Sequence, residues 1–156
     1  MIANRLLLFL AYSSLWLLYP PKPAPATTIA PAASGQHEQY FVAQAFLGEK
    51  LWLWQKRLNL TAWKIQLKLV RSSGLKPKTL GNIHWDADTH TADIHVLAPE
   101  DYKLSGPAML ADMEFTIVHE LVHLHLSSLP RSEASRGAEE HAVNEITQAL
   151  LNLDRR

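Results

Sequence analysis

The 156-residue chain contains no cysteine, and its charges leave no excess of either sign. The absence of cysteine excludes disulfide bonds, thiolate metal ligands and cysteine nucleophiles. Fifteen basic and fifteen acidic residues cancel, and the chain has neither basic runs nor the alternation of aromatic and basic residues that single-strand binders use. A nucleic acid is therefore not expected as a partner.

Long apolar runs are also scarce, and the one that stands out lies near the N-terminus. Residues 6–19 form an uncharged run of 14 residues, which is short for a membrane-spanning helix of about 20 residues but suits a secretory signal. A stretch rich in Pro, Ala and Thr follows up to Gly35. We expect residues 1–35 to be a signal peptide or membrane anchor with a linker, and residues 36–156 to be the folded domain.

This N-terminal segment determines the expected location of the protein. A cleaved signal predicts export to the periplasmic or extracellular side, whereas an uncleaved segment would tether the domain to a membrane through residues 6–19. If translation starts further downstream, the segment is not made and the protein is cytoplasmic.

The remaining sequence predicts a small α+β domain. Apolar residues recur at helical spacing in three stretches and alternate with polar residues in the segments between them. Two of these segments, 83–85 and 94–96, are expected to form a hairpin with Ile83, Trp85, Ile94 and Val96 facing inward. The second strand, the last before the motif helix, is expected to offer an edge where an extended peptide could pair. The expected elements are a packing helix over 40–58, strands over 63–70, 83–85 and 94–96 in one antiparallel sheet, and helices over 107–126 and 138–153.

The helix expected over 107–126 carries the sequence His119-Glu120-Leu121-Val122-His123. Histidines at positions i and i+4 lie on the same face of a helix, so both imidazoles can bind one metal ion, with Glu120 at its edge. Apolar residues cover much of the rest of this helix, and a buried helix must satisfy its ionisable groups. The pattern predicts a zinc site with a carboxylate beside it.

A catalytic zinc ion usually takes three protein ligands, so one more residue is needed. One known extension places a histidine six residues after His123, but Leu129 occupies that position here. The other known solution is a glutamate on a following helix. Glu139 and Glu140 stand at the start of the helix expected over 138–153, where the helix dipole favours a carboxylate, and either could be the ligand.

The segment from His119 to His123, followed by Glu140-His141-Ala142-Val143-Asn144-Glu145-Ile146 and Ala149-Leu150-Leu151, resembles the small gluzincin-type metallopeptidases, including the ImmA/IrrE group. The resemblance implies Glu140 as third ligand, Glu120 as general base and a minimal zincin-like domain over residues 36–156. Val143 departs from the alanine that this group often has, and the doubled glutamate leaves the ligand ambiguous by one position. No upstream motif extends the resemblance.

The function expected from these residues is that of a zinc metallopeptidase. One Zn²⁺ per chain, held by His119, His123 and Glu140, would activate a water, and Glu120 would act as general base on a peptide or protein substrate. The alternatives are a zinc-binding scaffold without turnover and a membrane-tethered interaction protein. Nothing in the sequence indicates the substrate's side chains or an oligomeric state.

Four further features are weaker candidates. Tyr102, His125 and His141 could donate a hydrogen bond to a developing oxyanion, and Asn144 or Glu145 could orient a ligand histidine. The loop over 127–137 could border a substrate cleft. The outward-facing histidines of the hairpin resemble a second metal site, but exposed histidines across a hairpin are common and no carboxylate-rich shell accompanies them; they are His84, His90 and His95.

Overall fold

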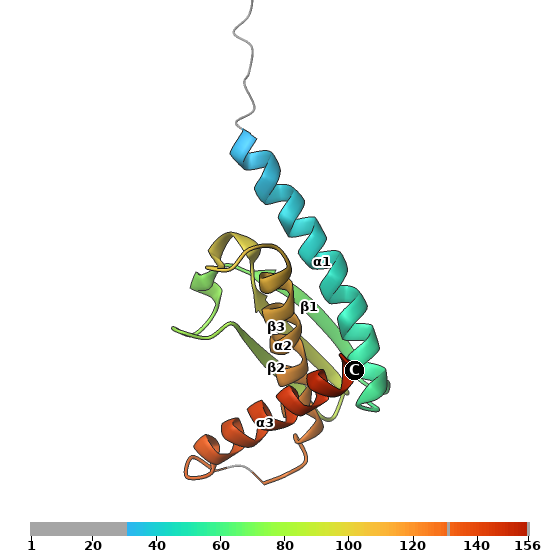
Figure 1. Cartoon of the computed structure of the whole chain (residues 1–156). Helices are drawn as coiled ribbons and strands as arrows, with labels where there is room; N and C mark the ends of the chain where they lie inside the picture. Colours follow the sequence, from blue (N-terminus) through green and yellow to red (C-terminus); the bar gives the residue numbers. More distant parts are fainter. Residues whose placement is uncertain (1–30, 131, 156) are drawn as a thin grey trace, which may run out of the picture.

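The computed structural model describes residues 31–130 and 132–155 and has three helices and three strands in this part (Figure 1). The predicted α+β class is therefore confirmed. The elements in chain order are α1 (Pro31–Arg57), β1 (Lys64–Val70), β2 (Gly81–Asp86), β3 (Thr91–Leu97), α2 (Gly106–His125) and α3 (Arg136–Asp154), with short 3-10 turns at Ser72–Gly74 and Pro99–Asp101.

The three strands form one mixed sheet in the order β1-β3-β2. The predicted hairpin is present, since β2 and β3 pair antiparallel with Ile83 opposite Ile94. The prediction of an antiparallel sheet is wrong for β1, which pairs parallel with β3 and places Leu67 beside Ile94. The reason is that the connection over 71–80 carries the chain past the neighbouring position, and β3 then returns between the two earlier strands.

This strand order also corrects the expected peptide-binding edge. The last strand before the motif helix, β3, is central and has both its edges paired. Within the described part of the chain, the strand edges left unpaired belong to β1 and β2. Any added strand would have to pair with one of these two.

Helices cover one face of the sheet, so the domain has two layers. Along β1, half-buried Ile65, Leu67 and Leu69 alternate with exposed polar residues, as the period-two pattern predicted. Helix α2 packs on β2 and β3, and α1 packs on α2, as Figure 1 shows. The largest fully buried side chains include Trp54, Leu47, Ile94, Met113, Ile117, Leu121 and Leu124.

Helix α1 is longer than the sequence predicted, because it begins at Pro31 instead of Tyr40. Its first turns therefore occupy the end of the segment expected to be a linker. Its C-terminal half is fixed to α2 by Glu114, whose Oε1 lies 2.9 Å from Lys50 Nζ and accepts a hydrogen bond of 3.0 Å from Trp54 Nε1. This buried carboxylate thus has both a cation and a hydrogen-bond donor from α1 as partners.

The expected signal or anchor over residues 6–19 lies outside the described residues. Of the helices in the described part, none combines the length and the apolarity that crossing a membrane requires.

Candidate metal centre

Helix α2 presents the two histidines from a buried framework. Pro107 lies in its first turn, where the missing N–H costs nothing, and the apolar stripe that includes Met113, Ile117 and Leu121 is fully buried. These contacts fix the rotation of the helix about its axis. The opposite face then turns His119 and His123 toward α3, which packs on α2.

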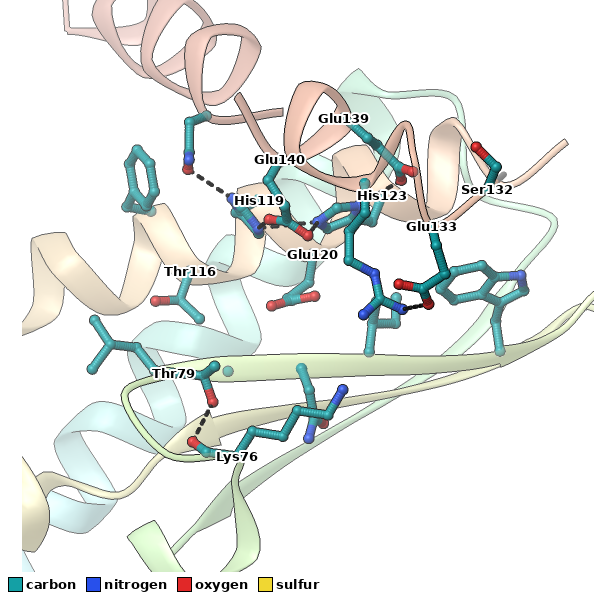
Figure 2. A pocket seen from close by; sticks show the side chains of 18 residues that line it. Lys76, Thr79, Thr116, His119, Glu120, His123, Ser132, Glu133, Glu139 and Glu140 are labelled. Atoms are coloured by element: carbon teal, nitrogen blue, oxygen red, sulfur yellow. Dashed lines mark hydrogen bonds and ion pairs between the residues drawn. The ribbon is translucent and has the colours of Figure 1, made fainter. Parts of the chain in front are cut away.

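His119, His123 and Glu140 converge on one point. The Nε2 atoms of the two histidines lie 3.1 Å apart. Each Nε2 lies 3.4 Å from a carboxylate oxygen of Glu140, which the first turns of α3 carry to this place. Within the part of the chain that the structure describes, these three residues form the group that could hold a metal ion, with ligand atoms within 4.8 Å of one another. Figure 2 shows all three side chains directed toward each other.

The outer nitrogen of each histidine has a hydrogen-bond acceptor on α3. His123 Nδ1 lies 3.1 Å from Glu139 Oε1, and His119 Nδ1 lies 3.1 Å from Asn144 Oδ1. Because a carboxylate can only accept, His123 Nδ1 carries the hydrogen, and the amide oxygen of Asn144 fixes His119 in the same way. Both Nε2 atoms are then unprotonated lone-pair donors, the form that binds a metal.

This arrangement fits a tetrahedral zinc ion. Two ligand atoms bound to zinc at about 2.0–2.1 Å and a tetrahedral angle lie about 3.3 Å apart, and the two Nε2 atoms here are 3.1 Å apart. The carboxylate of Glu140 faces both of them, with Oε2 at 3.4 Å from His119 Nε2 and Oε1 at 3.4 Å from His123 Nε2. Two facing imidazole lone pairs have no proton to share, so a cation between them removes their repulsion. Two nitrogens and one carboxylate oxygen also form a donor set that catalytic zinc uses.

The electrostatics of the site agree with neutral ligands and a basic neighbour. Burial lowers the pKa of His119, and the nearby His123 lowers it further, so the imidazole is neutral at neutral pH. Burial also raises the pKa of the Glu120 carboxyl to about 7, and the negative charge of Glu140 adds to this effect. A carboxyl group with a pKa near neutrality can both take and return a proton.

These residues lie on the wall of a pocket of about 790 Å³. One side of the pocket is formed by α2 with Phe115, Thr116, His119, Glu120 and His123. The other side is formed by β2 and the residues just before it, and α3 with its preceding loop closes one end. Ser132, Glu133 and Arg136 belong to the loop and helix start over 127–137 that was expected to border a cleft.

Gly81 allows β2 to approach α2 closely beside Glu120. A Cβ atom at this position would lie 2.5 Å from Thr116 Cγ2, 2.8 Å from the carbonyl oxygen of His95 and 3.4 Å from Glu120 Oε1. The first two separations are shorter than van der Waals contact. Glycine is thus required here by space, and it sets the distance between the strand and the helix that carries Glu120.

The structure does not bring every sequence candidate to the site. The Tyr102 side chain is largely buried and does not line the pocket; burial raises the pKa of its phenol, and the nearby Asp112 charge contributes. His125, His141 and Glu145 are exposed and lie outside the pocket lining. Asn144 does contact His119, one of the candidate ligands. The structure therefore does not place Tyr102, His125 or His141 where it could donate a hydrogen bond to an oxyanion in this pocket.

The hairpin histidines do not assemble a second metal site. The rings of His84 and His95 are 6.3 Å apart, whereas His90 packs at 5.2 Å against Trp63. Over the described ranges, they do not belong to a group of three metal-ligating side chains.

Sequence reasoning missed three features of this site. The role of Glu139 as partner of His123 depends on the angle between α2 and α3, which no sequence pattern encodes. Lys76 and Arg136 line the pocket but come from segments without a recognisable motif. In the sequence, the segment around Lys76 is marked only by Pro77 and the positive charges of Lys76 and Lys78, which do not indicate a pocket.

No protein-family model, curated protein or solved structure matches the chain.

Proposed function

We propose that the protein is a zinc-dependent metallopeptidase. The observation that carries the proposal is the convergence of His119, His123 and Glu140, with the two Nε2 atoms at tetrahedral ligand spacing and the carboxyl group of Glu120 in the same pocket. A structural zinc site is normally closed by four protein ligands, whereas three ligands beside a pocket leave a position for water and substrate. The donor set therefore favours hydrolysis.

A peptide is the substrate class that the pocket favours, because the exposed edge of β2 borders it. The Leu97 N–H donates to the Leu80 carbonyl at 2.8 Å, so alternate residues from Leu80 onward direct their peptide groups to β3. The peptide groups of Gly81, Ile83 and Trp85 then face away from β3, and all three residues line the pocket. An extended peptide could add there as a further strand, beside Glu120.

The chain's own groups account for the proton transfers of such a reaction. When bound, the zinc ion supplies a Lewis acid and a water of lowered pKa. Glu120 would take the proton of the attacking water and then return it to the amine nitrogen as the peptide bond breaks. Glu139 and Asn144 hold the ligand imidazoles in the required tautomer. The β2 edge would hold the substrate in register.

Metal analysis combined with peptide cleavage tests this proposal. We expect about one zinc per chain in the wild type, little in His123→Ala and Glu140→Ala, and a full zinc content in Glu120→Gln with cleavage reduced by at least about 100-fold. His125→Ala is the matched control, since this exposed histidine of α2 lies outside the pocket. A wild-type protein that binds zinc but cleaves no member of a broad peptide library would favour a zinc-binding scaffold instead.

A further inference from the structure

The pocket wall opposite the three candidate ligands begins with a tight turn formed by residues 76–79. The Lys76 carbonyl oxygen accepts hydrogen bonds from the backbone N–H of Thr79 at 3.2 Å and from its hydroxyl at 2.8 Å. Pro77 occupies the second position, and Lys78 in the third has φ of 66°. This combination is typical of a type II turn, and it fixes the point from which the Lys76 side chain leaves the backbone.

Lys76 places a positive charge on this wall. It lines the pocket together with Leu80 and Phe115, and Figure 2 shows it across the pocket from His119, His123 and Glu140. Within the described ranges Lys76 has no ion pair, and the segment over 71–80 contains no acidic residue. The other pocket cation among the described residues, Arg136, is paired with Glu133 at 3.2 Å.

The acidic residues of the pocket lie on the other side. Glu139 and Glu140 belong to α3, Glu133 precedes that helix, and Glu120 belongs to α2. Lys76, the cation of the pocket without an ion pair among the described residues, would attract a bound carboxylate. Leu80 is 40% exposed and, with Phe115, offers apolar surface for the methylene groups of such a ligand.

Building on the proposed peptidase function, we propose that Lys76 is a specificity-determining residue that selects peptides carrying a carboxylate group beside Leu80 and Phe115. The carboxylate can belong to an acidic side chain or to a free C-terminus, and both offer the same two oxygens to the ammonium group. An exposed ion pair of this kind is expected to favour the acidic peptide by about threefold to fivefold.

Matched peptides test this inference. One set is blocked at both ends and carries Glu, Gln or Lys at one scanned position, and a second set has no acidic side chain and a free or amidated C-terminus. Peptide binding is measured with Lys76 and its variants in the zinc-loaded Glu120→Gln protein. The kcat/KM for cleavage is measured with the same variants in protein that keeps Glu120. We expect the carboxylate preference to be lost in Lys76→Gln and reversed toward Lys peptides in Lys76→Glu.

Lys78→Gln is the control, because Lys78 belongs to the same turn but does not line the pocket; it should retain the preference. A preference that persists in Lys76→Gln, or that disappears equally in Lys78→Gln, would overturn the inference, as would the absence of binding by every peptide. Binding that depends on Lys76 without cleavage by the wild type would contradict the peptidase function and support the role of Lys76. Cleavage by the wild type without a carboxylate preference would support the peptidase function and contradict the role of Lys76.

Discussion

Glu139 Oε1 lies 3.1 Å from Nδ1 of His123, on the side of the ring away from the three converging ligand atoms. Adjacent glutamates on α3 thus make different contacts: Glu140 faces the two Nε2 atoms, and Glu139 contacts the outer nitrogen of one ring. The two residues that the sequence left as alternatives for one position both belong to the site.

Replacing Glu139 with Ala should weaken zinc binding by about 10-fold to 100-fold, because His123 loses the acceptor that fixes its tautomer and orientation. Glu139→Gln should lose less zinc affinity, since the amide oxygen of the glutamine can still accept the hydrogen of His123 Nδ1. Affinity can be measured by competition with a chromophoric chelator. Glu145→Ala is the matched control on the exposed side of α3. Equal affinities in Glu139→Ala and Glu145→Ala would show that the contact does not position His123.

Chelation should lower the melting temperature of the wild-type protein, because a ligand that binds only the folded state stabilises it by mass action. The stabilisation reaches about 4 kcal/mol when free zinc exceeds Kd by about 1,000-fold. Calorimetry with and without a chelator measures the shift. His123→Ala should show almost none of it, whereas His125→Ala should retain it. The same shift in all three proteins would place the metal elsewhere in the chain.

The motif helix could be predicted almost to the residue, because its apolar periodicity and Pro107 are local signals. The faces of the strands were predictable for the same reason. Whether β1 pairs parallel or antiparallel could not be predicted, because the alternation of apolar and polar residues in β1 is the same in both cases. The direction of pairing is set by the path of the connection over 71–80. The distinct roles of Glu139 and Glu140 required the packing of α3 on α2, which involves residues far apart in the chain.

The ion pair between Arg71 and Asp101 predicts a pH-dependent contribution to stability. Asp101 accepts hydrogen bonds from Arg71 at 2.6 and 2.9 Å and from the Ser72 N–H at 2.6 Å, and these hold the pKa of its carboxyl well below the usual range, chiefly through Arg71. A carboxyl whose pKa is lower in the folded state stabilises the fold above its unfolded pKa of about 3.9. This stabilisation is lost as the pH falls through the folded value.

Asp101→Asn should therefore melt at a lower temperature than the wild type at neutral pH, and the difference should shrink as the pH falls well below about 3.9. Thermal melts across this pH range measure the effect. Asp93→Asn is the control, because Asp93 pairs with Lys68 where both side chains are about half exposed, at 47% and 53%, and such pairs contribute little. A difference that stays constant with pH would exclude the ion pair as its cause.

Gly81→Ala should destabilise the protein by about 1–3 kcal/mol, because its Cβ would overlap Thr116 Cγ2 and the His95 carbonyl oxygen. Gly48→Ala is a useful contrast, since Gly48 lies within α1 with nothing within 4 Å of an added Cβ; it should stabilise by about 0.5–1 kcal/mol. Denaturant unfolding of the chelated proteins separates these effects from zinc binding. Because β2 would have to move away from α2, Gly81→Ala should also raise KM for a cleaved peptide more than Gly48→Ala does. Unchanged stability and KM in Gly81→Ala would mean that the space between β2 and α2 at this position can accept a Cβ atom.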